Sequence, residues 1–127
     1  MRVLWPNKNE VAELSALFGF NAIGDEQDWE FEFADENRVE EFIVCYGSGN
    51  LSDPQKMAVM QLIMASFDDL VESEKDDTEL WTEISNFLIK DAQIHGSTIE
   101  YWSCVGETEH DNMFPTTLRI RELANAL

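Results

Sequence analysis

Basic residues are scarce in this chain of 127 residues. Eight Lys and Arg stand against 26 Asp and Glu, which gives a formal net charge of −18 at pH 7. Nucleic-acid backbones and anionic membrane surfaces repel such a chain, because they carry charge of the same sign. The composition therefore argues against direct binding to nucleic acid or to a membrane, and it favours a basic protein as partner.

Long apolar runs are also missing. No stretch approaches the roughly 18 consecutive apolar residues that span a bilayer, and residues 1–6 lack the apolar core of a signal peptide. We therefore expect a cytoplasmic protein. The two cysteines, Cys45 and Cys104, lie beside bulky apolar residues, so we expect reduced, mostly buried thiols rather than a disulfide.

Residues that commonly carry catalysis are few. Of the two histidines, His95 precedes Gly96, where capping a helix end is the favoured interpretation. The other, His110, lies in an acidic segment with Cys104 as the only soft metal ligand nearby. The sequence also lacks a glycine-rich phosphate loop and the spaced oxygen ligands of a calcium loop. We expect a protein that is not an enzyme and holds no cofactor or metal.

Apolar residues are sufficient for a core, since they make up 44% of the chain. Residues 1–127 are therefore expected to form a single compact domain. Their helical spacing predicts about five helices. These helices cover approximately residues 10–18, 35–46, 55–73 and 78–92, and a last segment that begins at Pro115 and packs Leu118, Ile120, Leu123 and Ala124 inward.

Two segments have a pattern more typical of strands. Aromatic and acidic residues alternate from Trp29 to Phe33, which predicts a half-buried strand with its aromatic side chains inward. Residues from Ser97 to Cys104 are rich in β-branched and aromatic types, which indicates a second strand or an extended segment. The expected fold class is therefore mainly α, with at most a small two-stranded β element and with His95 and Gly96 ending the fourth helix.

Some apolar residues fit either a core or a binding surface. Met57, Met60 and Met64 recur at helical spacing inside an apolar run, so core packing is favoured over an adaptable groove. Trp102 and Phe114 would serve as interface anchors, but core positions are again the favoured interpretation.

Acidic residues concentrate in two tracts. The first runs from Asp25 to Glu41 and contains one basic residue, Arg38; the second runs from Asp68 to Glu79 and contains only Lys75. Charge of this density exceeds what solubility requires, and it steers association with a basic protein, raising the rate by roughly 10 to 10³. Nuclease toxins are basic because they bind phosphates, so the tracts fit an inhibitor of such a toxin. A halophile-like surface or a soluble adaptor would give the same composition.

We expect the recognition residues at a helix end with its adjoining turn, and in a later loop that has aromatic neighbours. The first set consists of Asp68, Asp69, Glu72, Asp76 and Asp77, and the second of Glu107, Glu109 and Asp111.

Three segments carry a resemblance to known proteins: residues 51–69, Tyr101-Trp102-Ser103, and residues 114–122. Over residues 30 to 125 the chain resembles small acidic bacterial proteins, among them immunity proteins of contact-dependent growth inhibition systems. The resemblance implies neutralisation of a toxin domain at the C-terminus of a large exported effector, by binding and without turnover. It names no interface.

The leading hypothesis is therefore an immunity protein that binds and neutralises a basic, nuclease-type toxin domain. The alternative is a small acidic regulatory or adaptor protein that binds a host protein. A third possibility, a metal-dependent enzyme centred on Cys104 and His110, requires a metal in the purified protein.

Overall fold

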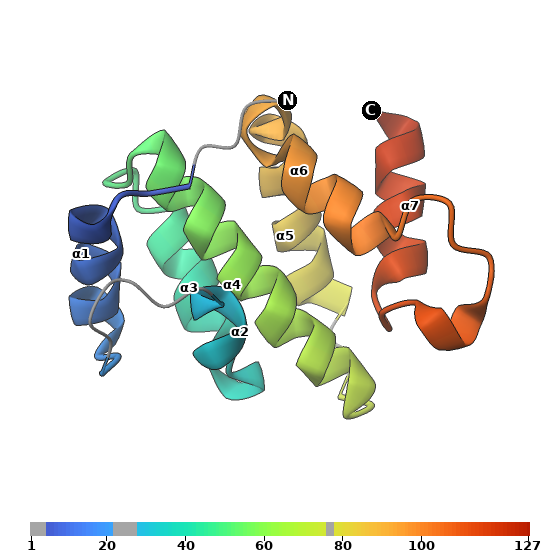
Figure 1. Cartoon of the computed structure of the whole chain (residues 1–127), viewed down its shortest axis with the longest axis horizontal. Helices are drawn as coiled ribbons and strands as arrows, with labels where there is room; N and C mark the ends of the chain where they lie inside the picture. The colour runs from blue at the N-terminus through green and yellow to red at the C-terminus, as the bar shows by residue number, and fades with distance from the viewer. Residues whose placement is uncertain (1–4, 22–27, 76–77) are drawn as a thin grey trace.

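Helices account for the fold, as the computed structural model shows for residues 5–21, 28–75 and 78–127 (Figure 1). The described residues contain seven α-helices and two short 3₁₀ helices and no strand, so the mainly helical prediction is confirmed and the β element is not formed there. The elements are α1 (Lys8–Phe18), α2 (Trp29–Glu32), η1 (Glu36–Arg38), α3 (Val39–Tyr46), α4 (Asp53–Glu72), α5 (Thr78–Lys90), α6 (Ala92–Ser103), η2 (His110–Asn112) and α7 (Thr117–Ala126).

Helix α4 lies at the centre of the molecule. Its start is fixed by a capping box, in which the Ser52 hydroxyl accepts from the backbone N–H of Gln55 and the Gln55 side chain accepts from that of Ser52. Helices α2, α3 and α6 pack around it (Figure 1). The three methionines of α4 are at most 1% exposed, which confirms their core position. Although α4 has 20 residues, none of the described helices combines the length and hydropathy of a membrane span.

An aromatic cluster joins α1, α2 and α3. The rings of Phe20 and Phe33 stack with their centroids 4.5 Å apart, and Phe18 meets Phe42 edge to face at 5.0 Å. Beside them, the buried indole of Trp29 donates a hydrogen bond to the Ser15 hydroxyl at 3.0 Å. This cluster anchors the short helix α2 on the side of α4.

The strand predicted at residues 29–33 is wrong, because these residues form α2 and its C-cap. The alternating pattern does not distinguish a strand from a helix here, because positions i and i+4, Trp29 and Phe33, share one face in either structure. Trp29 is buried and Phe33 is partly buried, but Phe31 between them is 43% exposed. Alternation over five residues therefore did not distinguish the two structures.

The predicted boundary at His95 and Gly96 is also wrong. Helix α5 ends at Lys90, and α6 begins at Ala92 and continues through His95 to Ser103, so the second predicted strand is helical too. A tertiary contact keeps this segment in place, because the buried His95 ring bonds to the Tyr46 hydroxyl from α3. The same hydroxyl bonds to Asp91, where the chain passes from α5 to α6.

The last helix follows the prediction with one exception. Ile120 and Leu123 of α7 are buried and Ala124 is partly buried, as expected, but Leu118 is 56% exposed. Leu118 is the second residue of α7 and lies outside the buried face of the helix, which contains Thr117, Ile120 and Leu123.

Candidate functional site

The predicted recognition residues at the end of α4 have different environments. Asp68 is only 7% exposed, and its Oδ1 accepts hydrogen bonds from the backbone N–H and the hydroxyl of Thr116 at 3.1 and 2.8 Å. Burial raises the pKa of this carboxyl. Asp68 thus connects α4 to the start of α7 and is not accessible to a partner, so its prediction as a recognition residue is wrong.

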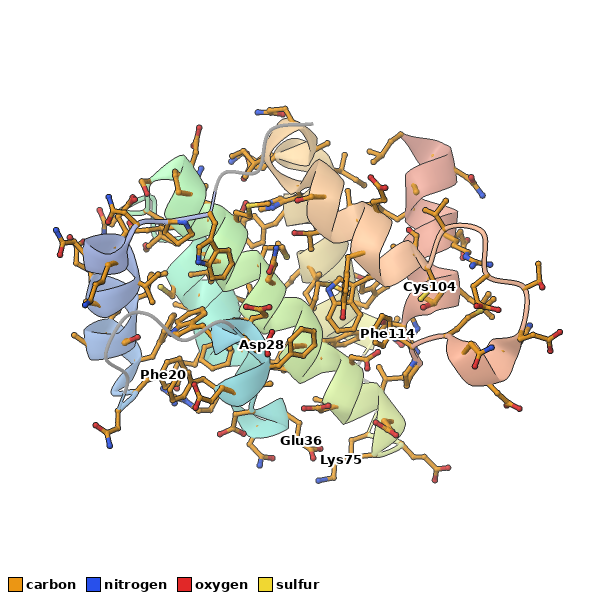
Figure 2. All side chains as sticks on the ribbon, in the orientation of Figure 1. Phe20, Asp28, Glu36, Lys75, Cys104 and Phe114 are labelled. Atoms are coloured by element: carbon orange, nitrogen blue, oxygen red, sulfur yellow. The ribbon has the colours of Figure 1, made fainter. Side chains whose placement is uncertain are left out.

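Asp69 and Glu72 are exposed and remain candidates. Burial and the neighbouring Glu72 and Glu36 raise the pKa of Asp69, so the three carboxyls form one acidic cluster. Nζ of Lys75 lies 3.5 Å from Oε2 of Glu36. Figure 2 shows both residues near the end of α4. Asp76 and Asp77 lie outside the described residues.

The second predicted set lies between α6 and α7. Glu107 accepts hydrogen bonds from the backbone N–H groups of Glu109 and Thr108 at 3.0 and 3.2 Å. The bond from Glu109 is the main cause of a lowered pKa at Glu107, and the Asn112 side chain adds to it. Glu109 and Asp111 are exposed on the same segment. Glu109 and Asp111 thus lie on the connection between α6 and α7, and Asp69 and Glu72 on the last turns of α4 (Figure 1).

Arg121 of α7 holds the segment that carries Glu107. Its guanidinium donates hydrogen bonds to the carbonyl oxygens of Ser103, Cys104 and Glu107 at 2.7 to 2.8 Å. Cys104 caps the end of α6 in the left-handed conformation, with φ 49°. The last carbonyl groups of any helix lack hydrogen-bond partners within that helix. One side chain from α7 therefore satisfies the end of α6 and orients the chain beyond it.

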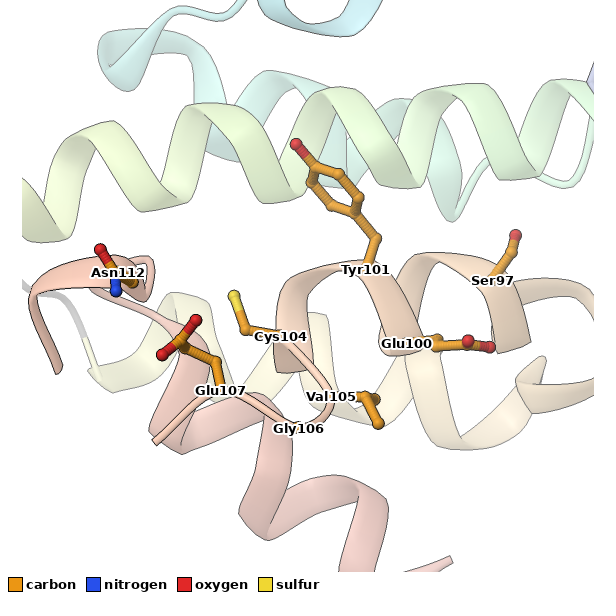
Figure 3. A pocket seen from close by; sticks show the side chains of 8 residues that line it. All are labelled: Ser97, Glu100, Tyr101, Cys104, Val105, Gly106, Glu107 and Asn112. Atoms are coloured by element: carbon orange, nitrogen blue, oxygen red, sulfur yellow. The ribbon is translucent and has the colours of Figure 1, made fainter. Parts of the chain in front are cut away.

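A groove follows α6 on the outside of the molecule. It consists of an open depression of about 960 Å³ and a more enclosed cavity of about 250 Å³, which share Ser97 and Tyr101. We call the two together the α6 groove and the enclosed part the Glu30 pocket. The depression is lined by Ser97, Glu100, Tyr101, Cys104, Val105, Gly106, Glu107 and Asn112 (Figure 3), and the Glu30 pocket by Glu30, Phe31, Gln61, Ser97, Thr98, Tyr101 and Trp102.

The charge of the α6 groove has one sign. Glu30, Glu100 and Glu107 line it, and no Lys, Arg or His is among the lining residues that the structure describes. Burial raises the pKa of Glu30, a hydrogen bond from its own backbone N–H lowers it in part, and the nearby carboxylate of Asp28 raises it further. A cation in the groove would meet these carboxyl groups, of which Glu107 has Arg121 nearby, whose charge helps to lower the pKa of Glu107.

Two aromatic side chains of the groove face solvent. Tyr101 is 52% exposed and Phe31 is 43% exposed, and their ring centroids lie 6.1 Å apart. Beneath them, Trp102 is almost fully buried against Phe114, with the ring centroids 4.5 Å apart, which confirms its core position. A rigid core thus supports an exposed pair of rings that is flanked by carboxylates.

The described residues do not form the metal site that was considered at Cys104 and His110. Within residues 5–21, 28–75 and 78–127, no group of three or more His, Cys, Asp or Glu side chains is placed to hold a metal ion. Cys104 is partly buried beside the Thr117 hydroxyl, at 3.5 Å, and His110 is exposed. Cys45 and Cys104 are both free thiols, and both are only partly buried, whereas the sequence predicts mostly buried thiols.

The sequence reasoning missed most of the α6 groove. The sequence predicts a strand for Glu30 and Phe31, and a strand or an extended segment for Ser97 and Tyr101, although positions i and i+4 of a helix share one face. Reading residues 92–103 as helical would have placed Ser97 and Tyr101 together beside Glu100. Comparisons of the chain with protein-family models, with curated proteins and with solved structures gave no match.

Proposed function

We propose that this chain is an immunity protein of the cytoplasm that binds and neutralises a basic, nuclease-type toxin domain, without catalysing a reaction. The observation that carries the proposal is the α6 groove, in which the exposed rings of Phe31 and Tyr101 lie among Glu30, Glu100 and Glu107. Aromatic anchors at the centre of an interface, with polar and charged residues at its rim, are the usual arrangement in protein–protein recognition.

Charge and aromatic area have separate tasks in this proposal. The net charge of −18 creates a long-range field that speeds the encounter with a basic domain. Tyr101 and Phe31 then supply desolvated contact area at low conformational cost, because an aromatic ring has only two side-chain torsions. The carboxylates around the rings would then pair with basic side chains of the nuclease that otherwise contact phosphates.

The acidic end of α4 supplies a second argument. Asp69 and Glu72 lie in the last turns of the helix, where the negative end of the helix dipole disfavours carboxylates. The last turn contains no basic residue that would offset this repulsion. Charges that weaken the helix they belong to are better explained by binding than by stability.

The experiment is a low-salt purification of the tagged protein from its native host, followed by mass spectrometry of the species that copurify. Three samples are compared: wild type, Tyr101→Ala in the α6 groove, and Leu17→Ala as a matched control. Leu17 is 63% exposed on α1, outside the groove. We expect wild type and Leu17→Ala to recover a basic domain in stoichiometric amount and Tyr101→Ala to lose it.

The recovered domain is then tested for nuclease activity, with and without an equimolar amount of the wild-type protein. Inhibition at equimolar amount supports the proposal. A partner without toxic activity would favour the regulatory or adaptor function instead. Recovery that is equal for wild type and Tyr101→Ala would refute the role of the α6 groove.

A further inference from the structure

The Glu30 pocket brings together polar atoms from three helices. Glu30 comes from α2, Gln61 from α4, and Ser97 and Thr98 from α6. The amide of Gln61 donates to the Thr98 hydroxyl at 3.4 Å, so these two side chains are paired with each other. Besides this pair, the pocket contains the carboxyl of Glu30 and the hydroxyls of Ser97 and Tyr101.

Two atoms of these groups lack partners, although the carboxyl of Glu30 also accepts a hydrogen bond from its own backbone N–H. Oε2 of Glu30 and Oγ of Ser97 are both buried, and neither forms a hydrogen bond with the protein. A buried polar atom without a partner costs free energy, and a carboxylate oxygen costs more than a neutral one. Two such atoms from separate helices in one cavity indicate that the pocket is complete only when a hydrogen-bond donor enters it.

The shape of the pocket allows this entry. Its volume of about 250 Å³ accommodates several water molecules, and therefore also the planar end of a long side chain. Ser97 and Tyr101 project from α6 on the same side, towards α4 (Figure 3). The Glu30 side chain is partly exposed, and the last torsion of a glutamate is soft, so rotation can present both carboxylate oxygens to a ligand.

The residues that line the Glu30 pocket favour a cation as the ligand. Rings of Phe31, Tyr101 and Trp102 line the pocket, and Phe31 lies 5.9 Å from Trp102 between centroids. Aromatic faces attract cations, and a carboxylate binds them directly, whereas an anion would meet repulsion from Glu30. A planar guanidinium satisfies these conditions better than an ammonium, because it stacks on rings and donates two parallel hydrogen bonds to one carboxylate.

We propose that the Glu30 pocket binds a guanidinium group, presented by an arginine side chain of the basic partner. This inference rests on the proposed function for the source of the arginine, but the binding of guanidinium is testable without a partner. Glu30 would accept the paired hydrogen bonds, Ser97 would accept a third, and the aromatic rings would cover the faces of the ion.

The first experiment titrates the full-length protein with N-acetyl-arginine methylamide, by calorimetry and by following the indole N–H signal of Trp102 in NMR spectra. We expect a dissociation constant on the order of 1 mM for so small a ligand. Glu30→Gln keeps the shape of the side chain and should weaken binding roughly tenfold to hundredfold. Glu32→Gln, on the same helix but outside the pocket, is the matched control and should bind as wild type does.

Ser97→Leu is the second variant, since it removes the unpaired hydroxyl and fills the pocket, and it should abolish binding. Circular dichroism confirms that each variant is folded. N-acetyl-lysine methylamide distinguishes the type of cation, and equal affinity for it would overturn the choice of guanidinium. Free arginine distinguishes the source, because much tighter binding of free arginine would point to a small molecule rather than a partner's side chain.

The failures of the two proposals are distinguishable. Suppose that wild type recovers a basic domain and Tyr101→Ala does not, but that Glu30→Gln and wild type bind the arginine derivative equally. The guanidinium site is then refuted, and the proposed function stands. If the arginine derivative binds as expected but no basic domain is recovered, the proposed function fails and the guanidinium site remains.

Discussion

The hydroxyl of Tyr46 lies 2.6 Å from Nε2 of His95, inside the core between α3 and α6. The same hydroxyl lies 2.7 Å from a carboxylate oxygen of Asp91. Because Tyr46 has one proton and donates it to Asp91, Nε2 of His95 must carry the proton of the second bond. Nδ1 of His95 is buried without a partner, so the neutral ring fits the site and a protonated ring would leave a charged N–H unbonded.

This geometry predicts that the protein loses stability in mild acid. Burial lowers the pKa of His95 to about 4 from an ordinary value of 6.5. Between these two values the unfolded chain binds a proton at His95 that the folded protein does not, so unfolding becomes more favourable as the pH falls. The loss approaches about 3 kcal/mol by pH 4, at 1.4 kcal/mol for each pH unit.

The measurement is urea unfolding, followed by tryptophan fluorescence, at several pH values between 7 and 4. His95→Gln lacks the titrating ring, so the difference between its free energy of unfolding and that of wild type isolates the contribution of His95 from those of the carboxyl groups. His110→Gln, at an exposed position, should follow wild type. If the free energy of unfolding depends on pH in the same way for wild type and His95→Gln, the loss of stability in acid does not come from His95.

Asp68 is predicted to act on stability rather than on binding. Asp68→Ala would leave the N–H and the hydroxyl of Thr116 without a partner in the core, at a cost of about 2 to 3 kcal/mol. Asp68→Asn should cost much less, because both bonds end on Oδ1 and an amide oxygen can accept them. Thermal or urea unfolding tests both variants, with Asp69→Ala as the exposed control, expected within about 0.5 kcal/mol of wild type. Equal losses for the Ala and Asn variants would show that the carboxylate charge matters.

The fold was largely predictable where local signals were strong. Ser52 and Pro54 mark the start of α4, and its apolar length indicates a central helix. The strand and boundary predictions failed where distant contacts decide the structure. His95 beside Gly96 has the local pattern of a helix end, but the hydroxyl of Tyr46, far away in the sequence, retains it within α6.

The candidate site was less predictable than the fold. Charge density identifies the acidic tracts, but it does not distinguish an exposed carboxylate such as Asp69 from a buried one such as Asp68. That distinction depends on the start of α7 reaching the end of α4, where Thr116 meets Asp68. The Glu30 pocket likewise requires α2, α4 and α6 to meet, and no local pattern contains that information.

Arg121 is predicted to order the segment that carries Glu107. Arg121→Met keeps much of the aliphatic packing but removes the donors to three carbonyl oxygens, so residues 104–112 should become more mobile. We expect faster amide hydrogen exchange there and a stability loss of about 2 kcal/mol. Lys8→Met removes an exposed charge at the start of α1 and should leave exchange in residues 104–112 unchanged. Exchange at the wild-type rate in Arg121→Met would mean that other contacts hold this segment.

Different residues of the α6 groove are predicted to control the rate of association with the partner and the rate of dissociation from it. With the recovered basic domain, a Glu100→Gln and Glu107→Gln double variant should associate more slowly at low salt, because long-range charge acts on the encounter. Tyr101→Ala should instead dissociate roughly 30-fold faster, which corresponds to a hot-spot loss of about 2 kcal/mol.

Stopped-flow or biosensor kinetics at low and physiological salt measure both rates. Association of wild type should slow steeply as salt rises, because counterions screen the acidic surface. The double variant should respond less to salt, while Leu17→Ala should match wild type in both rates. An association rate that does not depend on salt would contradict the role of the carboxylates. Unchanged dissociation of Tyr101→Ala would instead exclude this ring as an anchor, because a buried hot-spot contact acts mainly after the encounter.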